Sequence, residues 1–451
     1  MGGGMALTLE AVAALAPDDA SAKAAKGLTS AAKWPTLGAN DQAVWGECQG
    51  SGSKPYQTQV DLSGPAFKCS CPSRKFPCKH GLALLMLQAQ SPTLFTTTEA
   101  PAWVAEWVVS RSEKAQKKEE RQAEKAAAPV DEQAQARREA QRWQRIENAA
   151  EELQRWLGDQ MRQGLGALTN EVLQTWHTMA ARMVDAQAPG LAQRVHAAAQ
   201  GVRQGEDWPE RTLHRLGLLQ LACEALQRRS SLSPELQAEL RVVAGWPLDK
   251  AEVLASGEQV EDAWTVLGCA QEERDDKLIE RRVWLHGHRS GRRAWLWDHA
   301  FGGKGFEQAW IPGTCVNATL AYFPGTTGLR AQPVNVHGVP TEPQWPQSTA
   351  ADEWGDMARR TAASPWVGWH PLVLPDAVFQ PLGTQPGLRC ADRWLPLQMP
   401  GDDLWVLNAV SGGNPITVAG EWDGQTFAPL TAWHTHMPQP SASPAWQRSQ
   451  A

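Results

Sequence analysis

The chain has 451 residues and a formal net charge of −6, with 43 Lys and Arg against 49 Asp and Glu. Its length exceeds the ~250–300 residues at which a single hydrophobic core stops growing, so two or three domains are expected. The acidic balance argues against a protein that coats a polyanion, because neutralising phosphates requires an excess of lysine and arginine. No segment approaches the ~20 consecutive apolar residues of a transmembrane helix, and the N-terminal residues lack the basic leader of a secretory signal. We therefore expect a cytoplasmic protein whose eight cysteines are metal ligands or buried residues rather than disulfides.

The first region, residues 1–109, is predicted to hold a short helix over residues 7–15 and then a β-hairpin. The hairpin consists of the strand AVWGEC, the turn QGSGSK and the strand YQTQVDL. The second strand shows the period of two that is typical of a half-buried strand. Further along, GLALLMLQAQ is apolar on nearly every face, which predicts a buried helix.

Between the hairpin and this helix, the segment FKCSCPSRKFPCKHG holds two pairs of candidate metal ligands. Cys69 and Cys71 are two residues apart, as are Cys78 and His80, so the members of each pair project from the same face of an extended chain. Three thiolates and one imidazole suit tetrahedral zinc, and a site filled by four protein ligands leaves no position for a water nucleophile. We therefore predict one structural zinc ion per chain. A disulfide or free redox-sensing thiols are the alternatives, but a disulfide leaves His80 without a role.

The segment around these ligands is basic. Five cationic residues lie between positions 54 and 80, where Asp61 is the only acidic residue: Lys54, Lys68, Arg74, Lys75 and Lys79. Positive charge near thiols favours the thiolate form. The same side chains are also candidates for contacting phosphates or an acidic protein partner.

Cys-x-Cys, a short spacer and Cys-x-His entering a helix resemble the SWIM zinc finger. Residues 44–90 match its layout of strand pair, ligands and helix, with Cys69, Cys71, Cys78 and His80 as the ligands. Over roughly residues 5–110 the chain is similar to a bacterial family of SWIM zinc-finger proteins. Members of that family are often encoded beside MoxR-type AAA ATPases and von Willebrand A-domain (VWA) proteins. The resemblance implies a module that binds DNA or protein, rather than a catalyst.

Three further regions follow the first. Residues 110–147 contain Ala, Gln and mixed charge without an apolar stripe, which predicts an exposed, partly helical linker or a partner-binding arm. Residues 148–250 show apolar residues at steps of three and four, which predicts an α-helical domain with breaks at Pro189-Gly190, near Pro209 and at Ser233-Pro234.

Residues 251–451 are predicted to be β-rich. RRVWLHGHRSGRRAWLWD is expected to form a hairpin, and four segments are expected to form strands: VNATLAYF, DLWVLNAV, NPITVAGEW and TFAPLTAW. Residues 338–400 give no assignment. The predicted class is therefore α+β multidomain: a small ββα zinc module, a charged linker, an α-helical domain and a β-rich C-terminal region.

The remaining histidines and cysteines give no second metal site. His286 with His288, and His434 with His436, are His-x-His pairs without a suitable third ligand nearby, so we expect surface histidines. The other five cysteines are expected to be buried apolar residues: Cys48, Cys223, Cys269, Cys315 and Cys390. The chain lacks a complete phosphate loop, a GxSxG elbow and an HExxH motif, so no enzymatic activity is predicted.

Two functional hypotheses remain. The first is a non-enzymatic adaptor that docks a protein through apolar side chains such as Trp45, Phe67 and Phe76, with the lysines as a polar rim. The second is a DNA-binding protein that uses the basic face of the finger. Five cations contact only a few phosphates, too few for tight binding at physiological salt, so the adaptor is favoured.

Overall fold

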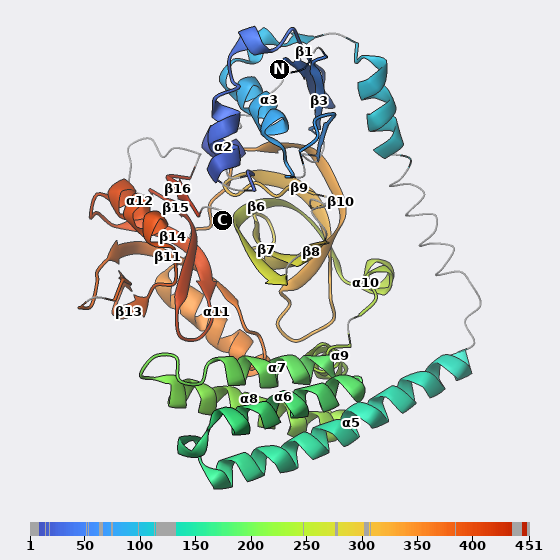
Figure 1. Ribbon diagram of the computed structural model, residues 1–451, viewed down its shortest axis with the longest axis vertical. Helices are drawn as coiled ribbons and strands as arrows, with labels where there is room; N and C mark the ends of the chain where they lie inside the picture. Colours follow the sequence, from blue (N-terminus) through green and yellow to red (C-terminus); the bar gives the residue numbers. More distant parts are fainter. Residues whose placement is uncertain are drawn as a thin grey trace.

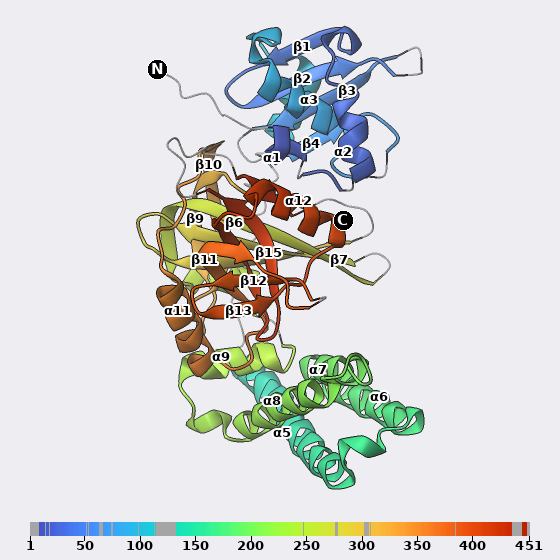
Figure 2. The ribbon, with the colours of Figure 1, turned by 90° about the vertical axis from the view of Figure 1, so that its left-hand side faces the viewer.

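The described residues of the computed structural model form a small sheet-and-helix unit, a helical bundle, a closed barrel and a second sheet, which confirms the predicted α+β multidomain class. The small unit lies at one end of the molecule and the bundle at the other, with the barrel between them and the second sheet beside the barrel (Figure 1, Figure 2). The structure describes residues 9–13, 15–17, 19–50, 52, 54–62, 66–73, 75–97, 99–111, 113, 132–246, 248–275, 278–301, 306, 308–383, 385–434 and 444–448. No helix in this described part is both long and apolar enough to cross a membrane.

The first unit contains a five-stranded sheet in the order β4-β3-β2-β1-β5. Its strands are β1 (Thr36–Ala39), β2 (Ala43–Cys48), β3 (Tyr56–Asp61), β4 (Ala66–Cys69) and β5 (Thr96–Thr97). Antiparallel pairing of β2 with β3 runs from Ala43 opposite Asp61 to Cys48 opposite Tyr56, which confirms the predicted hairpin.

Helices cover both faces of this sheet. One face packs against α3 (Lys79–Gln90), and α1 (Leu9–Ala13) and α2 (Asp19–Lys26) in turn cover α3. Because α3 has neighbours all round, its residues from His80 to Leu87 are buried, as its uniformly apolar sequence predicts. A helix over residues 102–111 covers Trp45 on the other face. Ile311, from the barrel, is also part of the core beneath α3.

The bundle contains five helices: α5 (Glu132–Gln163), α6 (Asn170–Asp185), α7 (Pro189–Gln200), α8 (Trp208–Gln227) and α9 (Pro234–Val243). Three of them start at the predicted breaks, because proline occupies the first turn of α7, α8 and α9. The predicted linker boundary at residue 147 falls inside α5, whose first described turns are mostly exposed while its residues from Ile146 onward enter the core. Residues 114–131 of that linker lie outside the described part of the chain.

The barrel closes through five strands in the order β10-β8-β7-β6-β9, and α10 (Lys250–Ser256) precedes them. Its strands are β6 (Gln259–Asp275), β7 (Leu278–Gly287), β8 (Arg293–Phe301), β9 (Cys315–Tyr322) and β10 (Arg330–Thr341). The predicted hairpin is formed by β7 and β8, with His286 opposite Arg293 at its end. Trp264 and Trp310 fill the interior, where they are at most 2% exposed.

The second sheet has the order β13-β12-β11-β14-β15-β16 and carries two helices. Its elements are α11 (Ala350–Ala363), β11 (His370–Phe379), β12 (Gly387–Cys390), β13 (Arg393–Pro396), α12 (Gly401–Ser411), β14 (Ile416–Trp422), β15 (Phe427–Trp433) and β16 (Trp446–Gln447). The unassigned segment 338–400 thus contains the end of β10, one helix and three strands.

The prediction of a strand at DLWVLNAV is wrong, because this segment forms most of α12. Asp402 and Asp403 lie in the first turn of the helix, where a negative charge stabilises the exposed N–H groups. Gly412, with φ of 58°, ends the helix in the left-handed conformation. The buried positions Asp403, Leu407 and Ser411 recur every four residues, which is the spacing of a helix face.

Candidate metal centre

The structure brings together the four residues predicted as metal ligands. Cys69 ends β4, Cys71 lies in the following loop, Cys78 is the N-cap of α3, and His80 lies in the first turn of that helix. Their ligand atoms all lie within 4.8 Å of one another. The hairpin and the helix therefore hold the two ligand pairs against each other, as their spacing predicts.

The surroundings favour a thiolate at one cysteine of the cluster, Cys78, and the neutral thiol at Cys69 and Cys71. The neighbouring Cys69 thiol, together with His80 and the N–H of Gly81, lowers the pKa of Cys78 to about 4. The N–H of Gly81 also donates to Cys78 Sγ, at 3.5 Å, because Cys78 caps α3. Burial raises the pKa of Cys71. A divalent cation among these sulfurs would hold all three as thiolates.

The donor set fits zinc. Three cysteine sulfurs and one histidine ring nitrogen make four ligands of the kinds that structural zinc sites use. His80 is oriented toward the sulfurs, with its Nδ1 3.8 Å from Cys69 Sγ. The ring of Tyr56 packs beside His80 with a centroid separation of 4.9 Å and limits the freedom of the imidazole. In the described part of the chain, no other group of three or more Cys, His, Asp or Glu residues is gathered in this way.

Close packing holds the helix against the ligand strand. A Cβ atom at Gly81 would lie 2.9 Å from Cδ1 of Phe67, which is tighter than normal contact. Only glycine therefore lets the start of α3 approach β4 closely enough for Cys78 and His80 to reach Cys69.

Thr58 is a supporting residue that the sequence did not indicate. This residue of β3 is fully buried, and its Oγ1 lies 3.2 Å from Cys69 Sγ. A hydroxyl at that distance stabilises and orients a metal-bound thiolate.

We expect Thr58→Val to weaken zinc binding by roughly 10–100-fold, because valine keeps the shape but removes the hydroxyl. Competition with a zinc chelator measures this change. Thr96→Val is the control, because its hydroxyl, in the same sheet, bonds the carbonyl of Leu37 at 2.9 Å instead. Equal zinc affinity of Thr58→Val and Thr96→Val would show that the Thr58 hydroxyl does not act on the metal site.

The basic residues of the finger divide between two faces of the sheet. Phe67 belongs to the core beneath α3, so its neighbour Lys68 projects from the opposite face. On that opposite face Gln59, the register partner of Lys68, donates to the carbonyl of Trp103 at 3.4 Å. Lys75 and Lys79 are exposed near the start of α3 instead. Lys54 is exposed near the end of the hairpin turn, and Arg74 lies outside the described residues.

Two of the three apolar side chains expected at a docking surface are core residues. Trp45 is 4% exposed and Phe67 7% exposed, because the helix over residues 102–111 and α3 cover the two faces of the sheet. That part of the prediction is wrong. Phe76 is 39% exposed and remains available at the surface.

An open groove of about 630 Å³ lies between α2 and the ligand loop. Small and apolar residues of α2 face two lysines and two of the zinc ligands across it. The residues of this groove that matter here are Ala20, Ala24, Leu28, Tyr56, Cys71, Ser73, Lys75, Lys79 and His80.

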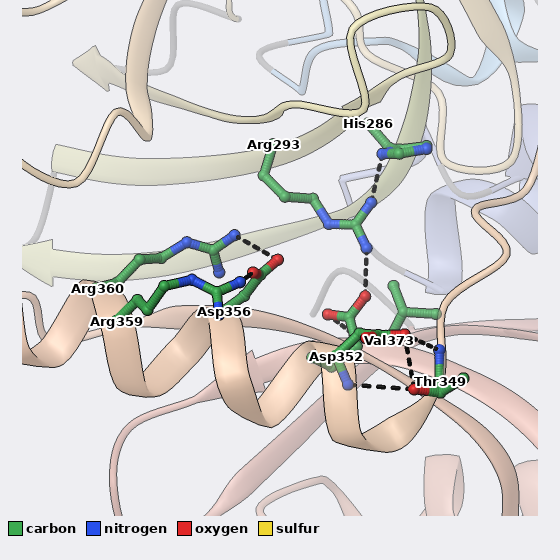
Figure 3. Close-up of polar contacts among 9 residues, drawn as sticks. His286, Arg293, Thr349, Asp352, Asp356, Arg359, Arg360 and Val373 are labelled. Atoms are coloured by element: carbon green, nitrogen blue, oxygen red, sulfur yellow. Dashed lines mark hydrogen bonds and ion pairs between the residues drawn. The ribbon is translucent and has the colours of Figure 1, made fainter.

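His286, expected at the surface, belongs instead to a polar network between the barrel and α11 (Figure 3). Arg293 is 8% exposed, and its Nη1 lies 2.5 Å from Nδ1 of His286. Its Nη2 donates to Glu353 of α11 at 2.6 Å. The second carboxylate oxygen of Glu353 accepts the N–H of Val373 at 3.1 Å. His286 thus has a structural partner, while His288 is exposed.

Burial, together with the charge of Arg293, lowers the pKa of His286 to about 3. An unfolded chain takes up this proton near pH ~6.5, so His286 should reduce the free energy of unfolding by at most ~2 kcal/mol between pH 7 and pH 5. His286→Gln keeps an acceptor for Arg293 but cannot be protonated, so we expect a weaker loss of stability over this range. Denaturant unfolding at each pH measures the effect, with His288→Gln as the control. Parallel pH profiles for wild type and His286→Gln would contradict this account.

The other cysteines and His434 do not belong to the candidate metal centre. All five other cysteines are free and buried, as predicted. His434 is partly buried at the end of β15, and its pair member His436 lies outside the described residues.

Comparison with known families gives two matches within this architecture. The SWIM zinc finger family matches residues 56–88, which hold all four ligands. The SWIM-associated four-helix bundle domain matches residues 141–244, within α5 to α9. No curated protein and no solved structure matches the chain. The chain therefore contains a segment similar to the SWIM zinc finger and, after it, a helical region similar to the domain that accompanies this finger.

Proposed function

We propose that this protein is a non-enzymatic, cytoplasmic adaptor whose finger docks another protein in the groove between α2 and the zinc site. One structural zinc ion per chain, bound by Cys69, Cys71, Cys78 and His80, would hold the wall of that groove in place. These four protein side chains would fill all four positions of a tetrahedral zinc ion. The metal would then hold a surface in shape and would have no position for a reactive water.

The groove has an apolar side and a positively charged side. Its α2 side offers Ala20, Ala24 and Leu28, a narrow apolar surface next to the ring of Tyr56. Lys75 and Lys79 are exposed on the other side. An apolar core with a charged rim is the usual arrangement of a protein interface. The groove therefore suits a partner segment that presents small apolar side chains flanked by Asp or Glu.

The division of the cations argues against DNA as the main ligand. A duplex contacts one face of a small module, and its affinity comes from counterion release, with a slope of log affinity against log salt of about −0.9 per phosphate neutralised. Lys68 lies on the face opposite Lys75 and Lys79, so one docked duplex reaches only part of the set. The alternative function, DNA binding by the basic face of the finger, would need cations from another unit.

A MoxR-type AAA ATPase or a VWA-domain protein is the partner we propose first. The reason is the sequence family that the finger resembles, in which genes for these proteins are often neighbours. Neither partner requires catalysis by the adaptor itself.

Site-specific photocrosslinking in the native cell tests the proposal. A photoreactive residue at Ser73 lines the groove, whereas one at Lys68 lies on the opposite face of the same sheet. We expect the Ser73 probe to capture an AAA ATPase or a VWA-domain protein, and Lys79→Glu to abolish that product. Capture by both probes alike, or no product at Ser73, would contradict docking in the groove.

Titration with DNA decides between the two functions. At near-physiological salt we expect weak, non-saturating binding of duplex and single-stranded DNA to the finger. Sub-micromolar binding that is lost in Lys75→Ala/Lys79→Ala would favour the DNA-binding alternative.

A further inference from the structure

The barrel has the topology of a known ligand-binding fold. Its strands follow the order β6-β7-β8-β10-β9, and β10 runs parallel to β8 at its point of closure. This is the arrangement of the OB fold, a five-stranded barrel that binds oligonucleotides or oligosaccharides. Ligands contact the outer face of its second and third strands and the loop between its fourth and fifth strands. Because a fold alone does not identify a ligand, the side chains at this surface determine what it can bind.

A pocket of about 480 Å³ lies at this place. The third strand, β8, and the loop over residues 323–329 between β9 and β10 form one side of it. Residues of α7, α9 and the loop after α11 close the other side. The volume is within the ~300–1,000 Å³ of small-molecule pockets, and a junction of units is a common location for such sites.

Stacked aromatic rings form the wall on β8. Ala294 and Leu296 point into the barrel core, so Trp295 and Trp297 project outward. The rings of Trp295 and Trp297 are stacked with centroids 5.5 Å apart, and Trp284 stacks on Trp295 from its other side at 5.6 Å. His299 continues the row at 5.3 Å from Trp297, so Trp297 is the tryptophan of the stack that lies nearer the open pocket. Phe323 and Trp366 add further aromatic surface to the pocket. Planar rings of this kind are the platform on which proteins stack nucleic-acid bases.

A half-buried cation, Arg330, lies beside the stack. Arg330 is in register with Trp295 on the adjacent strand, and its guanidinium lies 5.1 Å from the ring of Trp297 and 4.3 Å from that of Phe323. Burial lowers the pKa of Arg330 to about 10. No carboxylate pairs with Arg330 in the part of the chain that the structure describes.

The one carboxylate in the wall is engaged through one oxygen, while its Oε2 is buried without a hydrogen-bond partner among the described residues. Glu239 Oε1 accepts the N–H and the hydroxyl of Thr326, at 2.7 and 2.8 Å. Arg194, the other guanidinium in the wall, donates to the carbonyls of Gly190 and Val243 at 3.2 Å. Arg330 is thus the group whose charge an incoming anion would balance, and a phosphate is a good partner for a guanidinium.

We propose that this pocket binds one nucleotide, with its base against the aromatic side chains of Trp297, Phe323 and Trp366 and its phosphate at Arg330. The nucleotide is either a free mononucleotide or an unpaired residue of a single strand, since both carry the same base and phosphate. The site lies on the barrel, so it is separate from the groove of the finger.

Calorimetric titration of the full chain with AMP tests the proposal, with adenosine and ribose 5-phosphate as probes that lack one half of the ligand. We expect saturable binding of AMP and at least tenfold weaker binding of either partial probe. Arg330→Gln and Trp297→Leu should each weaken AMP binding by about tenfold or more. Arg359→Gln, at a side chain that is 74% exposed on α11, should leave it unchanged.

Thr327→Trp is a second way to test the site. It fills the pocket from the loop and leaves the stacked tryptophans and Arg330 unsubstituted. It should abolish AMP binding even if Trp297→Leu fails to fold. A short fluorescent single strand separates the two sources of nucleotide. Binding of the strand that AMP displaces identifies an unpaired residue as a ligand, and AMP binding without strand binding identifies the free nucleotide. Binding of AMP that Arg330→Gln and Thr327→Trp do not alter, no binding of AMP, or binding of a neutral oligosaccharide instead would overturn the proposal.

Discussion

Cys78→Ser should abolish stoichiometric zinc binding and unfold the first unit of the chain. Cys78 is both a candidate ligand and the N-cap of α3, so its loss affects the metal and the start of the helix together. Structural zinc supplies an apparent ~10–16 kcal/mol of folding free energy in small fingers, which is as large as the whole stability of a typical domain. Metal analysis of the purified protein, with amide hydrogen exchange over β1 to α3, measures both effects.

Cys48→Ser is the matched control for this variant. Cys48 is a fully buried cysteine of the same sheet, at the end of β2, but it is not among the four clustered residues. It should retain one zinc ion per chain, and protection in the bundle should be equal in both variants. One equivalent of zinc in Cys78→Ser, or exchange that is unchanged over α3, would contradict the assignment.

Arg282→Met should detach the second sheet from the barrel. Arg282 of β7 forms a bidentate pair with Glu421 of β14, at 2.9 and 3.0 Å, and the two side chains are 6% and 1% exposed. Glu421 also accepts the indole N–H of Trp284 at 2.7 Å. Removing one partner of a buried ion pair leaves the other charge without compensation, which costs ~3–5 kcal/mol. We expect early unfolding of β11 and β14 in denaturant, measured by hydrogen exchange.

The double variant Arg282→Met/Glu421→Gln separates lost packing from uncompensated charge. It removes the charges of Arg282 and Glu421 but leaves Glu280, which is also buried and pairs with Arg282 at 3.0 Å. It should therefore recover part of the stability that Arg282→Met loses. Arg359→Met, on an exposed side chain, should change stability by no more than ~0.5 kcal/mol. A double variant as unstable as the single one would mean that charge compensation is not what Arg282 supplies.

Short-range features were predictable from the sequence. The zinc ligands lie within twelve positions of one another, so their spacing alone indicated the cluster. Proline and its flanking residues marked the starts of α7, α8 and α9. In both cases, residues that are close together in the sequence are enough to indicate the feature.

Long-range features were not predictable in this way. Trp45 looked like a surface residue because the helix over residues 102–111, which covers it, lies far along the chain. Phe67 is close in sequence to α3, but the sequence did not show which face of the sheet α3 would cover. The segment of α12 is apolar on most faces, so its pattern did not separate a helix from a strand. The barrel closes where β10 pairs with β8, two strands that are separated in the sequence by β9. This pairing places Arg330 beside Trp295 in the wall of the pocket, so the pocket could not be predicted without it. Thr58 became a candidate only when β3 placed it beside Cys69.

Ile311 links two units that the sequence separates by some two hundred residues. It belongs to the barrel segment before β9, yet it is 1% exposed within the core beneath α3. Ile311 thus gives the finger and the segment before β9 a common packed contact, through which a change in one unit can reach the other. Linkage requires such a coupling to be reciprocal, so a protein bound at the groove and a nucleotide bound at the barrel would change each other's affinity by the same factor.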